Sequence, residues 1–133
     1  WSGAPVVAMG DRSRLQQVGM NLLLNAVDAV GEGGHVVVRT GVDGEAAWFE
    51  VRDDGVGIPE ELRNRIFDPF FTTKKPGQGT GLGLSISYSI VREHGGALGV
   101  ESEPGRGTTM RVSLPAVATA RAEEIPAPRR AAV

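Results

Sequence analysis

Nineteen glycines, most of them clustered, set the folding possibilities of this chain. They concentrate in four short stretches, at residues 31–34, 55–57, 77–83 and 105–107. Glycine adopts backbone conformations that other residues avoid, and it lets other groups come close to the main chain. Because these stretches separate segments with regular hydrophobic periodicity, they predict tight turns where the backbone approaches a ligand, and not flexible linkers.

The composition is that of one ordinary soluble domain. With 133 residues there is room for about one core, and 41% hydrophobic and 23% charged residues match globular averages. The net charge of -2 and the lack of a dense basic run argue against nucleic-acid binding. No segment has the length and apolar character of a membrane span or a signal peptide, so we expect a cytoplasmic domain without membrane contact.

The chain contains no cysteine and only two histidines. Disulfides, thiolate metal sites and thiol nucleophiles are therefore excluded, and a typical zinc site is disfavoured. Any bound metal is expected to be a hard ion held by oxygen ligands.

Hydrophobic periodicity predicts the elements between the glycine stretches. We expect a long helix that begins at Asp11 or Ser13 and ends at Gly31. A second long helix is expected from Thr80 to about His94, with Leu82, Ile86, Ile90 and Tyr88 facing inward. The remaining elements are an edge strand at 5–9, strands at 35–40 and 46–51, a short helix at 59–65, and a hairpin of strands at 97–102 and 108–114.

This order of elements predicts an α+β fold, a two-layer sandwich with a mixed sheet of about five strands and about three helices on one face. Residues 1–115 are expected to form the domain. Residues 116–133 are rich in Pro and Ala without periodicity, which is typical of a linker or a disordered tail.

A polar stripe runs along the first long helix. Gln17, Asn21, Asn25 and Asp28 are spaced by four, four and three residues, which places them on one face. A solvated surface would explain the stripe, but asparagine is a mediocre helix former and exposed faces more often carry charged residues. An amide oxygen suits Mg²⁺, so both interpretations remain open at this point.

The turn at 53–58 (Asp-Asp-Gly-Val-Gly-Ile) follows a predicted strand. An ordinary β-turn needs only one glycine. Two glycines let the backbone approach a flat ring, and a carboxylate beside it can accept a hydrogen bond from an exocyclic amine such as that of adenine. Alternatively, Asp53 and Asp54 form a Ca²⁺ or Mg²⁺ pair, although nothing nearby supplies the other ligands of a calcium loop.

The glycine-rich loop at 77–84 leads directly into the second long helix, where free N–H groups and the helix dipole favour an anion such as phosphate. Its spacing does not fit the Rossmann pattern, and the chain has neither a P-loop nor the Ser/Thr/Tyr kinase signatures. Lys74 and Lys75 precede it. Alone they predict solvated lysines, but beside a phosphate site Lys74 is expected to bind phosphate.

The order of the motifs resembles that of sensor histidine kinases, of the GHKL ATPase and kinase superfamily. Residues 15–26 resemble the N box, 53–57 the first glycine box, 67–75 the F box, 79–84 the second glycine box and 104–108 the last glycine turn. The resemblance covers most of the predicted domain. It implies a Bergerat-type fold that binds ATP.

The resemblance also implies roles for individual residues. Asn25 would chelate the Mg²⁺ that bridges the ATP phosphates, Asp53 would bind the adenine amine, and Thr108 would assist there, commonly through water. The other implied nucleotide-binding residues are Gly55, Gly57 and Ile58 of the turn, Lys74 and Lys75, and Gly79, Thr80, Gly81, Leu82 and Gly83 of the lid and phosphate cradle.

Two departures from the motifs narrow the expected chemistry. Hydrolytic relatives carry a water-activating glutamate four residues before the metal asparagine, where this chain has Asn21. An amide cannot accept that proton, so we expect transfer of phosphate to another nucleophile, with Asn21, Asn25 and Lys74 as catalytic residues. Asp28, Ala29 and Thr72 replace other common residues, which resembles the subclass with a Thr-Thr-Lys extension of the F box.

In such kinases the phosphate acceptor is a histidine on a separate helical dimerisation domain. Neither His35 nor His94 has the matching surroundings, so we expect a monomeric catalytic fragment that lacks its acceptor and acts with a downstream response regulator or receiver domain. A nucleotide-sensing interaction module, a serine-directed relative and a minor hydrolase are the alternatives.

Overall fold

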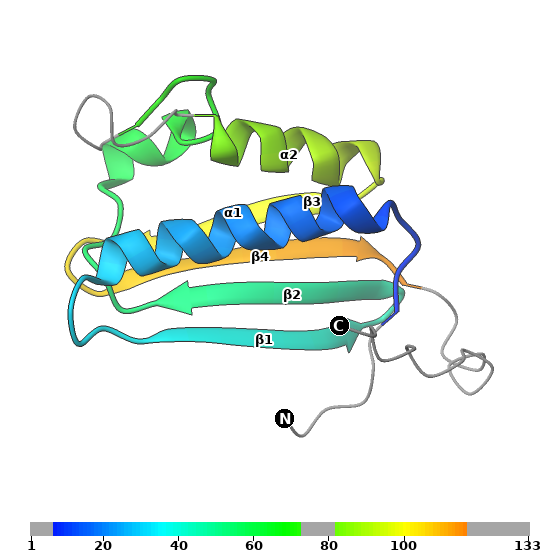
Figure 1. Cartoon of the computed structure of the whole chain (residues 1–133), viewed down its shortest axis with the longest axis horizontal. Helices are drawn as coiled ribbons and strands as arrows, with labels where there is room; N and C mark the ends of the chain where they lie inside the picture. The colour runs from blue at the N-terminus through cyan, green and yellow to red at the C-terminus, as the bar shows by residue number, and fades with distance from the viewer. Residues whose placement is uncertain (1–6, 73–81, 117–133) are drawn as a thin grey trace, which may run out of the picture.

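The computed structural model describes residues 7–72 and 82–116. Figure 1 shows two long helices on the same face of a single sheet. The predicted α+β, two-layer arrangement is therefore confirmed. The elements are α1 (Arg12–Val30), β1 (Val36–Asp43), β2 (Ala46–Asp53), the 3-10 helix η1 (Glu60–Arg65), α2 (Gly83–Glu93), β3 (Ala97–Glu103) and β4 (Gly107–Pro115).

The sheet has the strand order β1-β2-β4-β3, and its three pairings are all antiparallel. The prediction of a mixed sheet is wrong for the described residues. The connection from β2 through the helices to β3 would give a parallel pair, but β4 lies between these two strands. Where a fifth strand was predicted, only an isolated antiparallel bridge joins Ala8 to Ala116 among the described residues.

Helix α1 begins and ends where its sequence predicts. Asp11 is its N-cap and accepts a hydrogen bond from the Arg14 backbone N–H at 3.2 Å, which satisfies one of the free donors of the first turn. Gly31 ends the helix with a φ of 62°, a conformation that favours glycine. Val18, Leu22 and Ala26 lie one helical turn apart and are buried against the sheet.

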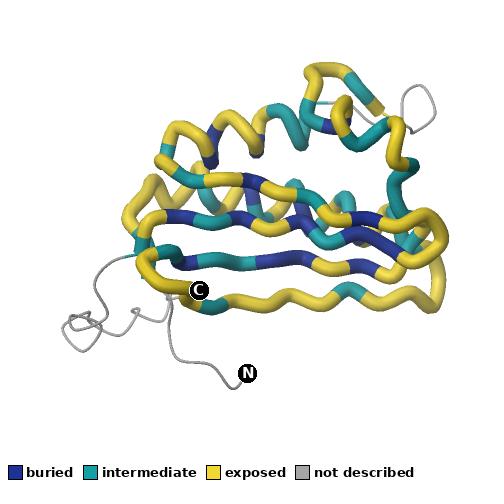
Figure 2. Tube along the Cα trace, turned by 180° about the vertical axis from the view of Figure 1, so that it is seen from behind, coloured by how far each residue is buried: buried dark blue, intermediate teal, exposed yellow. Residues whose placement is uncertain are grey.

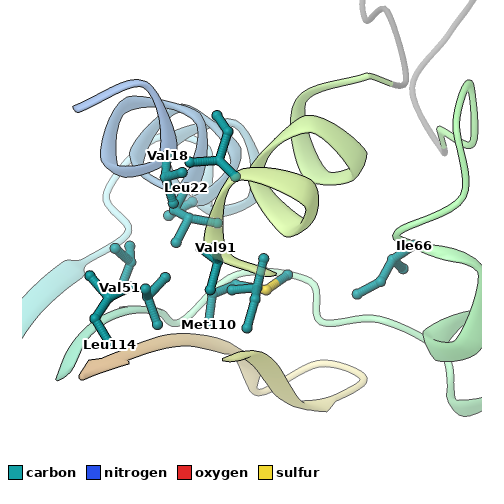
Figure 3. Packing of buried hydrophobic residues seen from close by; sticks show 11 residues of the cluster. Val18, Leu22, Val51, Ile66, Val91, Met110 and Leu114 are labelled. Carbon is teal, nitrogen blue, oxygen red and sulfur yellow. The ribbon is translucent and has the colours of Figure 1, made fainter. Parts of the chain in front are cut away.

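The core lies between the helices and the two central strands. In Figure 3, Val18 and Leu22 of α1 and Val91 of α2 point toward Val51, Met110 and Leu114 of the sheet. Figure 2 shows that buried positions concentrate on the middle of the sheet, whereas the edge strand β1 is largely exposed.

Helix α2 buries a face that differs from the predicted one. Ile90 is buried as expected, but Ile86 and Tyr88 are 37% and 39% exposed. Ser87 and Val91 face the interior instead, since α1 and β3 pack on adjacent sides of the helix. Tyr88 stacks on Phe67, with 5.2 Å between the ring centroids. No helix in the described part of the chain combines the length and hydropathy needed to cross a bilayer.

Candidate functional site

A cavity of about 780 Å³ lies where β2 ends and β4 begins. Asp53 and Thr108 are directly paired across these two strands, which places both side chains on its wall. The residues that line it come from α1, the turn after β2, the segment after η1, the start of α2 and β4. From the predicted site they include Asn21, Asn25, Asp53, Gly57, Ile58, Gly83 and Thr108.

Asp53 is a buried carboxylate held in a fixed orientation. Its Oδ1 accepts hydrogen bonds from the backbone N–H of Gly55 at 3.0 Å and of Thr108 at 3.2 Å. Asp53 is 6% exposed, and burying a carboxylate is costly unless it is hydrogen-bonded. Because both of these bonds fall on Oδ1, Oδ2 keeps its acceptor capacity for a donor in the cavity.

The turn after β2 is held between α1 and the β3–β4 hairpin. Gly57 has a φ of 72°, and a Cβ there would lie 2.1 Å from the backbone oxygen of Glu103. A Cβ on Gly55 would lie 2.4 Å from the backbone oxygen of Ala29. The Gly105 backbone N–H donates to the Val56 oxygen at 2.8 Å. The glycines therefore permit close backbone packing that fixes the cavity wall.

Asp54 points away from Asp53. Its carboxylate accepts hydrogen bonds from the His35 backbone N–H at 2.8 Å and from the ring Nδ1 at 3.0 Å. The backbone bond and then the ring bond hold the pKa of Asp54 below its ordinary value of 3.8. Asp54 thus ties β1 to the end of β2, and the alternative of an Asp53–Asp54 metal pair is not supported. Residues 7–72 and 82–116 contain no cluster of three or more acidic, histidine or cysteine side chains suited to a metal.

The polar stripe of α1 faces the cavity with three of its four members. Asn21 and Asn25 are partly buried and line it together with Asp28, which is exposed, whereas Gln17 is exposed and does not line it. The Asn21 amide nitrogen donates to the Gly83 oxygen and to the Ser87 hydroxyl, both at 3.2 Å. The interpretation of the stripe as a merely solvated face is therefore wrong for the part near the cavity.

Sequence reasoning missed the buried hydroxyl of Ser102, which lies beside the site. Its Oγ accepts from the Ile58 backbone N–H at 2.7 Å and lies 2.8 Å from the Thr108 Oγ1. The guanidinium of Arg63 donates to the Ser102 backbone oxygen. A signal exists in the sequence, because Ser102 continues the inward alternation of Leu98 and Val100 with a hydroxyl where an apolar residue is expected.

The second glycine box is described only at its end. Gly83 begins α2 and lines the cavity, and Leu82 precedes it as the N-cap residue. The other predicted phosphate ligands, Lys74, Lys75, Gly79, Thr80 and Gly81, lie outside the described residues.

Both histidines have structural partners. His35 is bound to Asp54 as described above. The His94 Nε2 accepts from the Asp11 backbone N–H at 3.0 Å, and its Nδ1 lies 2.7 Å from the Ile90 oxygen. Because a backbone N–H can only donate, Nε2 is the acceptor and Nδ1 carries the hydrogen. His94 therefore joins the end of α2 to the start of α1.

Comparison with known proteins shows to which family this chain is similar. Residues 10–118 match the histidine kinase-, DNA gyrase B-, and HSP90-like ATPases. Sensor kinase CckA of Brucella abortus is 40% identical over 87% of this chain and 14% of its own length. Sporulation kinase A of Bacillus subtilis is 42% identical over 80% of this chain and 17% of its own length.

Solved structures show a similarity to the same kind of protein. The catalytic domain of histidine kinase ThkA, in a nucleotide-free form, superposes with a TM-score of 0.76 at 37% identity, covering 86% of this chain and 75% of that one. The chain belongs to the histidine kinase-, DNA gyrase B-, and HSP90-like ATPase family. The predicted resemblance to the catalytic, ATP-binding domain of sensor histidine kinases is confirmed. The chain spans less than a fifth of the length of the two curated relatives described above.

Proposed function

We propose that this domain binds Mg-ATP in the cavity beside Asp53 and transfers the γ-phosphate to a histidine on a separate helical domain. The transfer breaks the bond between the γ-phosphorus and the bridging oxygen of ADP and forms a phosphorus–nitrogen bond, while the imidazole gives up its proton. The setting is the cytoplasm, where ATP is abundant. The domain comprises residues 1–115, and 116–133 act as a linker or tail.

The adenine end of the proposed site is supported by the Asp53 carboxylate. Its Oδ2 is suited to the exocyclic amine of adenine. Val56 and Gly57 of the glycine turn line the cavity and supply a wall for the flat ring, whereas Gly55 packs against α1 and does not line it. The cavity volume of about 780 Å³ is in the range of small-molecule sites.

The phosphate end is supported by the neutral amides of α1. Asn25 lines the cavity and offers the kind of hard oxygen that Mg²⁺ accepts, so the residues present fit the ion. ATP and water would supply its other ligands. Bound Mg²⁺ would neutralise charge on the phosphates. We place Lys74, Lys75 and the 79–83 segment around the phosphates on sequence grounds.

The amide side chain of Asn21 and its hydrogen bonds favour phosphate transfer over ATP hydrolysis. A water-activating residue must accept a proton, and the Asn21 nitrogen is instead a donor to the Gly83 oxygen and Ser87 hydroxyl. Asn21 thus holds the start of α2 against α1 near the phosphates. Without a base at this position, another nucleophile has to attack the γ-phosphate.

The acceptor is proposed to lie on another domain. Both ring nitrogens of His94 are engaged in hydrogen bonds. His35 lies just before β1, where its ring contacts Asp54. The partners are therefore a histidine-bearing dimerisation and phosphotransfer domain and a downstream response regulator or receiver domain. The isolated domain is expected to be monomeric.

Mixing the domain with candidate histidine-bearing helical domains and Mg-ATP tests the proposal. We expect acid-labile phosphate on the added domain, little label on the chain itself, and little free phosphate. Asn25→Ala should abolish transfer with the fold retained, and Gln17→Ala, on the exposed part of the same stripe, should leave it unchanged.

Four results would contradict the proposal. Strong labelling of the chain itself would show an internal acceptor. Rapid phosphate release without an acceptor would show a hydrolase. ATP binding without transfer to any histidine domain would favour a nucleotide-sensing module, and transfer to serine would favour the serine-directed relative.

A further inference from the structure

We propose that Ser102, which does not line the cavity, makes Thr108 a pure hydrogen-bond acceptor toward the nucleotide base and thereby contributes to selection of adenine over 6-oxopurines. This inference rests on the proposed ATP site. It begins with the three contacts of the Ser102 hydroxyl, which lies between the turn after β2 and the first residues of β4.

The Ser102 hydroxyl has one hydrogen to donate and two lone pairs to accept with. The Ile58 backbone N–H can only donate, so Ser102 Oγ accepts this bond, at 2.7 Å. The Gly107 backbone oxygen can only accept, so Ser102 donates its hydrogen across the 3.0 Å contact. The remaining neighbour is Thr108 Oγ1, at 2.8 Å.

The hydrogen of Ser102 is already used, so Thr108 has to donate to Ser102 for all three contacts to be hydrogen bonds. Any other arrangement would bring two oxygens together at one of these distances without a hydrogen between them. Ser102 and Thr108 are 7% and 8% exposed, and such an unmatched buried pair is costly. The Thr108 hydrogen therefore points at Ser102, and the Thr108 oxygen offers only lone pairs to the cavity that it lines.

The cavity consequently presents two acceptors side by side. Asp53 and Thr108 are paired across β2 and β4, and the Thr108 backbone N–H donates to Asp53 Oδ1. Neither the Asp53 carboxylate nor the Thr108 oxygen can satisfy a carbonyl. An amine on the base that donates directly matches these acceptors, whereas the carbonyl of a 6-oxopurine at the same position would face them without a donor.

Binding of ATP and of inosine triphosphate (ITP) tests the inference. Hypoxanthine carries a carbonyl where adenine carries the amine, and it lacks the bulky 2-amino group of guanine. We expect wild-type protein to prefer ATP. Ser102→Ala should lower the ratio of ATP to ITP affinity about tenfold, because the freed Thr108 hydroxyl can rotate and donate to the carbonyl.

A double-variant cycle separates this role from a structural one. Ser102→Ala should change the ratio no further in a Thr108→Val background, and Ser102→Thr, which keeps the hydroxyl, should retain the wild-type ratio. Ser113→Ala, on the same strand as Thr108 but at the opposite end, is the matched control. If Ser102→Ala does not fold, Ser102→Cys keeps a similar volume with a weak hydrogen-bonding group and should lower the ratio as well.

Two outcomes would overturn the inference. Ser102→Ala could lower both affinities by the same factor, which would make Ser102 structural only. Ser102→Ala could also lower the ratio of ATP to ITP affinity equally in the wild-type and Thr108→Val backgrounds, which would mean that Ser102 does not act through Thr108. Direct binding needs no acceptor domain, so a failure of histidine transfer leaves this test valid, while wild-type protein that binds no ATP would defeat the proposed site itself.

Discussion

Two neighbouring aspartates of the same turn act on different parts of the molecule. Successive residues at the end of a strand point to opposite sides, so Asp53 faces the cavity and Asp54 faces His35 at the surface. The residues are chemically identical, and only their environment separates the proposed ligand-binding role of Asp53 from the structural role of Asp54.

Asp53→Asn should weaken ATP binding by about one to two orders of magnitude while the fold is retained. The amide oxygen can still accept from Gly55 and Thr108, but the new NH₂ group meets the adenine amine as a second donor. Isothermal titration with Mg-ATP measures the effect. Asp54→Asn is the matched control, and an equal loss in both variants would argue against the assignment of Asp53.

The Asp54–His35 contact predicts a dependence of stability on pH. The folded state lowers the pKa of Asp54 below 3.8, so its stabilising contribution is complete above that value and is lost as the pH falls through the lowered pKa. Asp54→Asn should therefore reduce the free energy of unfolding near about pH 6, and the difference from wild type should be smaller near about pH 2.

Urea unfolding at both pH values measures this difference. The exposed Asp68→Asn variant controls for the loss of a surface carboxylate elsewhere. A deficit of Asp54→Asn that persists undiminished at the lower pH would mean that the charge is not responsible.

At the scale of elements, the turn after β2 and the β3–β4 hairpin form one packed unit. Gly57 approaches Glu103, Gly105 donates to the Val56 oxygen, and Ser102 accepts from Ile58. These contacts join segments far apart in the sequence at one end of the sheet. Damage to the unit should therefore affect stability and nucleotide binding together.

Gly57→Ala should destabilise the domain by at least about 2 kcal/mol, since its positive φ and the Cβ position near the Glu103 oxygen both oppose a side chain. Gly99→Ala, on the exposed side of β3, should change the free energy of unfolding by less than about 1 kcal/mol, because a Cβ there meets nothing within 4 Å. Chemical denaturation compares the two variants, and equal losses would contradict the packing described.

At the scale of the whole molecule, residues of both the helical layer and the sheet line the cavity. Its wall includes α1, β2, α2 and β4, and Ile66, which Figure 3 shows apart from the other labelled core residues, also lines it. A ligand that fills this space binds the folded domain and not the unfolded chain. Nucleotide binding should therefore raise global stability.

Mg-ATP at about 100 times its dissociation constant should stabilise the domain by about 2.7 kcal/mol and raise the Tm by on the order of 10 °C. Scanning calorimetry with and without nucleotide measures the shift. Asp53→Asn at the same nucleotide concentration should show a much smaller shift. An unchanged Tm in wild type would exclude tight binding under those conditions.

Much of the fold and of the site could be predicted from the sequence because the signals are local. The Asp11 cap, the Gly31 end of α1 and the inward Val18–Leu22–Ala26 face depend on neighbours within one or two helical turns. The glycine turns and the order of the motifs similarly indicated an ATP-binding domain of the sensor kinase kind before any long-range contact was known.

Tertiary structure alone decided the features that depend on distant segments. The placement of β4 between β2 and β3 makes the sheet antiparallel, and it brings Thr108 beside Asp53, 55 residues away in the chain. Asn21 reaches Gly83 and Ser87 across 62 and 66 residues. Such contacts follow from how the layers close on each other, which periodicity cannot report. The sequence by itself therefore determined the elements and the kind of site, whereas packing determined which oxygen accepts and which hydroxyl donates.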